Sequence, residues 1–243
     1  TVEEVKRLAT ETYGKIPTNA NVKPYVRPRE PVQRAARRVV YRDERAGKPI
    51  MQRFYQAPSY STAKAGEAEA LDLLGKIVAY GSTSRLYKEL VVKQKIASSI
   101  SGWYGGSGRD YGKIALTGLP AEGVSLEKLE AAIDAVIADV IANGVTQQEL
   151  DRARKVYIAD YLYESDSQST LARRYGYGLI VGQSIEQIET WPQALKKLTL
   201  ADLKAVAGKY FDLRASVTGY LIPEPAQAPQ SKAGAAGGSG SRG

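Results

Sequence analysis

The chain lacks the two residue types that most often carry catalytic or metal chemistry near neutral pH. None of its 243 residues is His or Cys. His is the usual general base and the commonest ligand of catalytic zinc, and Cys supplies thiolate nucleophiles and metal ligands. A Ser-His-Asp triad, a Cys-His dyad, a His-x-x-Glu-His zinc helix and disulfides are therefore excluded within this chain.

Positive charge is the second chemical signal. The formal net charge is +8, and a basic surface is the footprint of nucleic-acid binding. Much of the excess lies in residues 23–45, where prolines interrupt the segment. Aromatic residues are not interleaved with the basic ones, as stacking platforms for bases would require. We interpret this segment as a solvated connector and expect no nucleic-acid partner.

Three other groups of residues have both a chemical and a structural interpretation. The glycines within residues 105–108 would suit a phosphate cradle, but no Lys-Ser/Thr follows and the next residues form a strand pattern, which favours a hairpin turn. The run Arg-Arg-Tyr at residues 173–175 is a candidate substrate-binding cluster, although basic side chains on helices usually face solvent or nearby acids. Trp103 and Trp191 are expected to be core anchors.

Apolar periodicity and turn residues predict an α+β order of elements. Strands are expected at residues 37–43 and 50–57 as one hairpin, at 96–104 and 111–119 as a second, and at 215–222. Helices are expected at residues 2–13, 67–80, 82–94, 126–142, from 146 onward, and at 168–181, 184–195 and 200–210. Ser82 should cap the helix that follows it. The helices before and after Asn143-Gly144 should form an antiparallel pair.

Hydropathy argues against a membrane protein. No apolar run approaches the roughly 20 residues that span a bilayer. Residues 1–12 are charged and helix-like rather than signal-like. We therefore expect a soluble chain without a membrane span.

An internal similarity bears on domain organisation. Residues 1–9 align with residues 199–207, since both segments begin with Thr, place an acid at the third helical position and repeat the same apolar face. Any two capped amphipathic helices share some of this pattern. If the match is a true repeat, the chain comprises the closing helix of a preceding, missing domain (residues 1–17), a Pro-rich linker (18–35), one complete domain (36–223) and a disordered tail (224–243).

Three motifs in this order resemble one known family. They are Gly-Ser-Thr-Ser-Arg-Leu-Tyr-Lys-Glu-Leu at residues 81–90, Gly-Val-Thr-Gln-Gln-Glu-Leu at 144–150, and Leu-Thr-Leu-Ala-Asp-Leu at 198–203 with Lys-Tyr-Phe at 209–211. The chain is similar to the domain repeated in the pitrilysin/insulinase family of zinc peptidases, which includes the mitochondrial processing peptidases and their two-subunit bacterial relatives. The resemblance implies an antiparallel sheet with helices packed on it.

The resemblance also implies where zinc belongs. Family subunits contain two α+β domains, and zinc sits in the first, on an inverted His-x-x-Glu-His helix with a later Glu. This chain has no His, so we expect zinc only in an upstream domain of the full subunit, and no metal in this segment.

A second family feature is absent at two positions. The substrate-binding half of the family uses an Arg and a Tyr to hold the peptide backbone, and Val91 and Ser98 stand at those positions here. Neither side chain can replace its counterpart. A homologous partner subunit would then supply the pair. Ser84, Arg85 and Ser98 are candidate residues lining a substrate chamber, although helix capping by Ser82 and an ion pair of Arg85 explain that segment equally well.

We therefore expect the C-terminal domain of the zinc-bearing subunit of a bacterial heterodimeric peptidase. The complete enzyme would hydrolyse peptides through zinc-activated water, while this segment alone would be inactive. The alternative is a wholly non-catalytic scaffold subunit of the same family, and the sequence before Thr1 distinguishes the two. Because bacterial relatives of this kind are often exported, the periplasm is the expected compartment, with the cytoplasm as the alternative.

Overall fold

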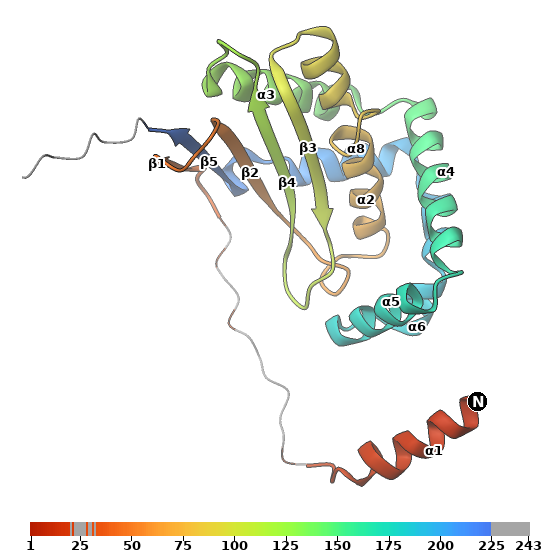
Figure 1. Cartoon of the computed structure of the whole chain (residues 1–243). Helices are drawn as coiled ribbons and strands as arrows, with labels where there is room; N and C mark the ends of the chain where they lie inside the picture. The colour runs from red at the N-terminus through yellow and green to blue at the C-terminus, as the bar shows by residue number, and fades with distance from the viewer. Residues whose placement is uncertain (20, 22–27, 29–30, 32, 225–243) are drawn as a thin grey trace, which may run out of the picture. The chain divides into compact units, whose positions relative to one another are not determined.

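The computed structural model describes residues 1–19, 21, 28, 31 and 33–224 of the chain (Figure 1). Two compact units are present, Thr1–Val32 and Gln33–Gly243, and each is considered by itself. Most of the expected linker and nearly all of the expected tail, residues 225–243, lie outside the described residues.

The described part of the first unit contains helix α1 (Val2–Thr12), followed by a short turn of 3-10 helix, η1 (Tyr13–Lys15). The hydroxyl of Thr1 accepts a hydrogen bond from the backbone N–H of Glu4 at 3.2 Å, which confirms the expected cap. No residue of α1 is buried within the described structure. The apolar stripe that the sequence predicts is present, but its side chains are exposed.

The second unit is built on a five-stranded sheet. Its strands are β1 (Arg37–Asp43), β2 (Ile50–Ala57), β3 (Ala97–Gly105), β4 (Gly112–Pro120) and β5 (Ser216–Pro223). Their order in the sheet is β1-β5-β2-β4-β3. Only the β1–β5 pair is parallel among these neighbours. The expected β3–β4 hairpin is confirmed, and so is the α+β class.

The expected hairpin of β1 and β2 is wrong, although both strands have the expected bounds. Strand β5 lies between them, pairing in parallel with β1 and antiparallel with β2. Leu221 of β5 is the partner of Tyr41 on one side and of Ile50 on the other. Strand β1 carries several arginines and is almost entirely exposed, which suits an edge, whereas the uncharged β5 suits the interior of a sheet.

Helices cover one face of this sheet (Figure 1). They are α2 (Glu67–Val78), α3 (Leu126–Asn143) and α8 (Leu200–Tyr210). Alternation along the strands turns Met51 and Tyr55 of β2, and Ile114 and Leu116 of β4, into one buried core. This layer fixes the outer helices that form the site described below.

The segment after α2 differs from the expectation. Ser82 does not cap a helix that starts directly after it; the helical residues begin at 85 and form mainly a π-helix, η2 (Tyr87–Lys93). The hydroxyl of Ser84 donates to the carbonyl of Gly81 at 2.8 Å and accepts from the N–H of Tyr87 at 3.4 Å. Residues 82–84, expected to form the first turn of a helix, therefore form a non-helical turn instead.

The predicted antiparallel pairing of the next two helices is also wrong. Helix α4 (Gln147–Glu164) has the expected capping box of Thr146 and Glu149. However, α3 packs on the sheet and on α8, whereas α4 packs on α2 and on α7 (Trp191–Lys197). Gly144 has φ 77°, a conformation that favours glycine and turns the chain away from the α3 direction.

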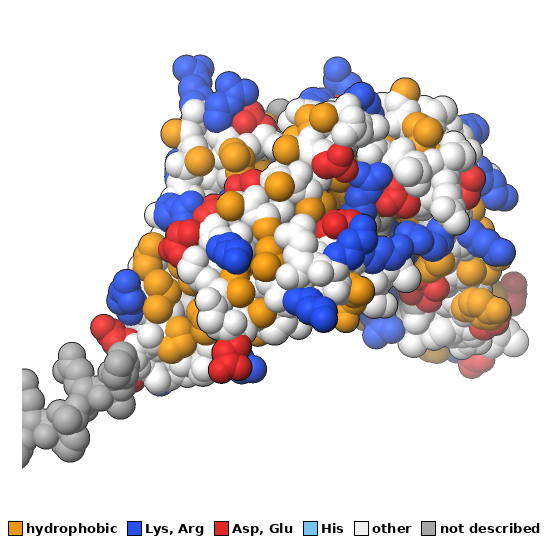
Figure 2. All heavy atoms as spheres, turned by 90° about the horizontal axis from the view of Figure 1, so that it is seen from above, with side chains coloured by type: hydrophobic (Ala, Val, Ile, Leu, Met, Phe, Trp, Pro, Cys, Tyr) orange, Lys and Arg blue, Asp and Glu red, His pale blue; other side chains and the backbone are white. Residues whose placement is uncertain are grey.

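Helix α5 (Gln168–Val181) has the expected bounds. The single helix expected at residues 184–195 is instead divided at Thr190 into α6 (Ile185–Glu189) and α7, whose first turn contains Pro192. None of the helices in the described ranges combines the length and apolar character that a bilayer crossing requires. Seen from above, Lys and Arg side chains lie beside Asp and Glu on the same face, with apolar side chains between them (Figure 2). That face therefore presents both signs of charge.

Candidate functional site

The residues expected to line a chamber are spread over different environments. Ser84 is completely buried, and its hydroxyl is used within the turn before η2, so it presents no atom to a chamber. Arg85 donates to both carboxylate oxygens of Glu149 at 2.7 Å and to Asp139 at 3.1 Å. The ion-pair interpretation of Arg85 is thus confirmed. Burial opposes ionisation of Glu149, but hydrogen bonds from Arg85 and Thr146 lower its pKa to about 2.

Of the two positions where the family's Arg/Tyr pair is missing, one packs on the core and the other is exposed on the surface. Val91 lies in η2 and packs, half-buried, against the core. Ser98 is exposed at an irregularity in β3, and its hydroxyl donates to the carbonyls of Leu119 and Pro120 at 3.3 and 3.1 Å. Arg85 lines a hollow of about 450 Å³ beside Asp139 and Glu149. Ser84, Val91 and Ser98 line neither this hollow nor the cleft described next.

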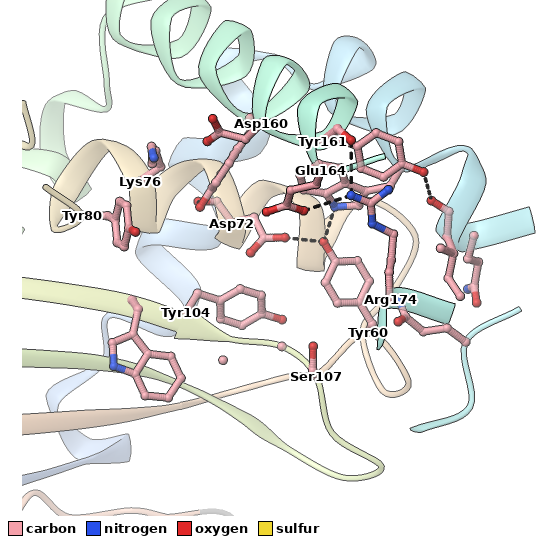
Figure 3. Close-up of a pocket in the computed structure, with 18 residues that line it drawn as sticks. Tyr60, Asp72, Lys76, Tyr80, Tyr104, Ser107, Asp160, Tyr161, Glu164 and Arg174 are labelled. Carbon is pink, nitrogen blue, oxygen red and sulfur yellow. Dashed lines mark hydrogen bonds and ion pairs between the residues drawn. The ribbon is translucent and has the colours of Figure 1, made fainter. Parts of the chain in front are cut away.

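A different cleft, with a volume of about 650 Å³, gathers aromatic and charged side chains from several elements (Figure 3). We call it the aromatic cleft. Its aromatic lining consists of Tyr60, Tyr80, Trp103, Tyr104, Tyr157, Tyr161 and Trp191, and its charged lining consists of Asp72, Lys76, Asp160, Glu164 and Arg174. This volume lies within the range of small-ligand sites, roughly 300–1,000 Å³.

Helical spacing explains much of this gathering. Asp72 and Lys76 are one turn apart on α2, and Tyr80 follows at the same interval just after the helix. On α4, the lining residues are spaced three or four positions apart, which places them on one face of the helix; they are Tyr157, Asp160, Tyr161 and Glu164. The two helices pack on each other, so these polar stripes face one cleft.

Two glycines allow strand β3 to complete the wall. A Cβ atom on Gly105 would lie 2.3 Å from Cζ3 of Trp103, and one on Gly106 would lie 2.6 Å from Cε1 of Tyr104. Both rings fold back over the loop, which leaves no room for a side chain there. The glycine-rich segment is thus a turn, as expected, and the lack of side chains at Gly105 and Gly106 leaves space for the two rings.

A chain of hydrogen bonds ends on the carboxylate of Asp72 (Figure 3). The indole N–H of Trp191 donates to the hydroxyl oxygen of Tyr60 at 2.6 Å, and the hydroxyl of Tyr60 donates to Asp72. Tyr157 donates to the main-chain carbonyl of Asp72 at 3.3 Å. Burial raises the pKa of Asp72 to about 7, against the hydrogen bond from Tyr60, which lowers it. Burial and the nearby Asp72 also raise the pKa of Tyr60.

The cations of the cleft are held by rings and by main-chain groups. The guanidinium carbon of Arg174 lies 3.8 Å from the ring centre of Tyr161. Its nitrogens donate to Glu164 at 3.0 Å, to Ser165 at 3.2 Å and to the carbonyl of Tyr161 at 3.3 Å. The ammonium of Lys76 lies 4.3 Å from the ring centre of Tyr80. The walls therefore stabilise cations through ring faces.

The expectations for the tryptophans and for residues 173–175 are met only in part. Trp191 packs against the core, as expected. Trp103 instead has 47% of its surface exposed, with the ammonium of Lys113 at 5.4 Å from its ring centre. Arg174 points into the cleft but pairs with an acid, and Tyr175 instead donates to Glu189 at 3.1 Å. The three side chains form no common cluster.

The cleft offers groups for binding. In the described part of the chain, no three carboxylates come together in a way that could hold a metal ion. Sequence reasoning missed the cleft because it looked for family motifs. The usable signal was the recurrence of Asp, Lys and Tyr at intervals of four, at residues 72, 76 and 80, along the mainly apolar second half of α2 and just after its end.

Comparison with known proteins agrees with this architecture. The sequence pattern described as the peptidase M16 inactive domain matches residues 1–157. A protease from Helicobacter pylori has 25% sequence identity and a TM-score of 0.81, over 92% of this chain and 53% of that protein. The peptidase M16 inactive domain from Pseudomonas fluorescens has 18% identity and a TM-score of 0.75, over 94% of this chain and 52% of that one.

A more distant similarity extends to a larger enzyme. The periplasmic protease PqqL from Escherichia coli has 15% identity and a TM-score of 0.71, over 94% of this chain and 27% of that protein. The chain spans about half the length of the Helicobacter and Pseudomonas structures. No curated protein sequence matches the chain. The match over residues 1–157 and the shared fold show that this chain belongs to the peptidase M16 family, the pitrilysin/insulinase family that its sequence resembles, as an inactive domain of that family.

Proposed function

We propose that the chain is the non-catalytic C-terminal half of a zinc metalloendopeptidase subunit, and that the complete enzyme hydrolyses peptides. The observation that carries this proposal is the match to the M16 inactive domain in a chain without His. The role of this half is to close the substrate chamber, to contact the partner and to cover the peptide.

The described residues do not fit a zinc site of their own. They include no His or Cys, and no three carboxylates among them converge. The proposal therefore assigns zinc to a separate upstream domain with a His-x-x-Glu-His helix. It also assigns the peptide-holding Arg/Tyr pair to a homologous partner subunit, because Val91 and Ser98 stand at those positions here.

Helix α1 supports the domain organisation within this proposal. Its capped start and apolar stripe match those of α8, which packs on α2 and α3. We assign α1 to the end of a preceding domain, where an equivalent surface would bury its stripe. A periplasmic location fits the similarity to PqqL, which is described as a periplasmic protease.

The test is an activity measurement on defined chains. Intact mass spectrometry establishes that a preparation contains only the 243-residue chain. This chain is assayed with zinc and peptide alone, then after addition of an upstream His-x-x-Glu-His domain, and finally with the partner subunit as well. We expect hydrolysis only in the last mixture. Hydrolysis by the chain alone overturns the proposal, and inactivity of every mixture favours the scaffold-subunit alternative.

A further inference from the structure

The floor of the aromatic cleft contains a carboxyl group, Asp72, whose charge in the ionised form no described Lys or Arg balances. The groups that act on the Asp72 carboxylate are the hydroxyl of Tyr60, the indole of Trp191 and the acid Glu69; no Lys or Arg is among them. Asp160 also faces the cleft (Figure 3) and forms no ion pair with a described cation. A partly buried carboxylate without a cation is costly unless something else compensates it.

The resident cations of the cleft are already engaged. Arg174 is paired with Glu164 and lies on the ring of Tyr161. The ammonium of Lys76 lies between the rings of Tyr80 and Tyr157, at 4.3 and 5.1 Å from their centres. These two side chains show that rings of this wall hold cations. They leave the carboxylates of Asp72 and Asp160 unneutralised.

We infer that the aromatic cleft is a subsite for the side chain of a Lys or Arg residue of a peptide. The carboxylates of Asp72 and Asp160 attract the positive charge, and the rings of Tyr60, Tyr104 and Trp191 contact the aliphatic stem and the cationic head. That the ligand is a peptide rests on the proposed function. That it is cationic rests on the cleft itself.

An anionic side chain is the opposite possibility, and the charges disfavour it. It would have to approach Asp72 and Asp160 and compete with Glu164 for Arg174, whose guanidinium is fixed by Ser165 and by a main-chain carbonyl. Only Lys76 would attract it. A neutral aliphatic side chain would contact the rings but would leave the Asp72 carboxylate without a cationic partner.

The two tryptophans make the inference directly measurable. The chain has only Trp103 and Trp191, and both line the aromatic cleft. Pentapeptides with blocked ends, carrying Arg, Lys, norleucine or Glu between pairs of glycines, are titrated into the 243-residue chain at pH 8, and tryptophan fluorescence is recorded. We expect a saturable change with Arg and Lys peptides, and at least about tenfold weaker binding of norleucine and Glu peptides.

Two variants and a matched control locate the binding. Asp72→Asn should weaken binding of the Arg peptide about tenfold or more, and Asp160→Asn about threefold, because each removes one attractive charge. Asp166→Asn makes the same charge change in the exposed turn between α4 and α5, outside the cleft lining, and should leave binding unchanged. Circular dichroism shows whether each variant is folded, and Asp160→Asn remains informative should Asp72→Asn misfold.

The inference is overturned by no fluorescence change with any peptide, by equal binding of the Arg and norleucine peptides, or by preferential binding of the Glu peptide. Equal losses in Asp160→Asn and Asp166→Asn would do so as well. None of these results touches the proposed function, which depends on hydrolysis by the assembled subunits. Conversely, selective binding of basic peptides by a chain that never supports hydrolysis would retain the subsite and reject the peptidase role.

Discussion

Helices α1 and α8 begin in the same way but have opposite exposure. Each spans 11 residues, and the Thr before each accepts a hydrogen bond from the backbone N–H three residues on, at 3.2 Å in α1 and 3.3 Å in α8. In α8, Leu203 and Val206 are 0% and 5% exposed. At the matching positions of α1, Val5 and Leu8 are 66% and 47% exposed.

The difference separates two contributions to a helix. Caps and periodicity are local, so they set the start and the apolar face of both helices. Burial of that face depends on a surrounding surface, which α8 finds on α2, α3 and β2. Isolated helices shorter than about 12–15 residues are marginal in water. Helix α1 therefore needs a surface equivalent to the one that covers α8.

The largest difference in the loss of unfolding free energy is expected between substitution of a buried arginine and substitution of an exposed one. Arg53 is 1% exposed in the second unit and pairs with Glu130 and Asp134, whereas Arg7 of α1 is mostly exposed and pairs with Glu11. Arg53→Ala should lower the free energy of unfolding by about 3 kcal/mol or more, since it empties a buried position, removes one of the two arginines that pair with buried Glu130 and leaves Asp134 without its cation. Arg7→Ala should leave it unchanged. Urea unfolding followed by circular dichroism gives both values, and similar losses would contradict the comparison.

A matched pair of leucines tests the helices themselves. Leu203→Ala in α8 creates a cavity in the core and should cost about 3 kcal/mol of unfolding free energy. Leu8→Ala in α1 should change it by less than about 0.5 kcal/mol, because the side chain is half exposed. If an upstream domain covers α1, the cost of Leu8→Ala rises when that domain is present in the protein. An equal effect with and without it would reject the assignment of α1.

The free energy of unfolding should depend on pH through Asp72 of the second unit. The native pKa of Asp72 is about 7, above its ordinary value, so the folded chain retains a proton that the unfolded chain has lost. The free energy of unfolding should therefore fall as pH rises from about 4 to about 7, on the order of 1–2 kcal/mol from this group after solvent screening. Thermal unfolding at pH 5 and pH 8 measures the slope. Asp72→Asn should flatten it, and deletion of residues 1–17 should not.

The smallest effect is expected at the helix caps. Thr199→Ala removes the capping box of α8 and should cost about 1 kcal/mol. Thr1→Ala should leave global stability unchanged and only increase fraying of α1. The N–H groups of Glu4 and Asp202 donate to the two capping threonines, so amide hydrogen exchange at these residues measures the opening of the N-terminus of α1 and of α8 separately. Global destabilisation by Thr1→Ala would show that α1 is packed on the rest of the protein.

Local features could be predicted from the sequence, and long-range pairings could not. The bounds of the strands, the caps at Thr146 and Thr199 and the turn at residues 105–108 follow from neighbouring residues. The parallel pairing of β1 with β5 joins strands nearly the whole domain apart. No local pattern distinguishes it from a hairpin with β2, since the connecting residues suit a turn in either case.

The aromatic cleft was hidden for the same reason. The hydrogen bond between Tyr60 and Trp191 joins residues 131 positions apart. The predicted family positions, by contrast, are neighbours in sequence, and the structure uses them for a turn, an ion pair and core packing. Helical spacing in the sequence shows which residues share a face of α2 and which share a face of α4. Only the packing of the two helices on each other shows that these faces line one cleft.

The place of β5 in the sheet has a consequence for synthesis of the chain. Within the described sheet, β1 has no neighbour other than β5, and β2 has β5 on one side. Edge strand β1 and the β5-facing side of β2 therefore wait for residues 216–223, which leave the ribosome after every other described strand. Contacts of such high sequence separation slow folding. Until residues 216–223 have emerged, the sheet of a nascent chain is thus open at β2, and a chaperone can bind there.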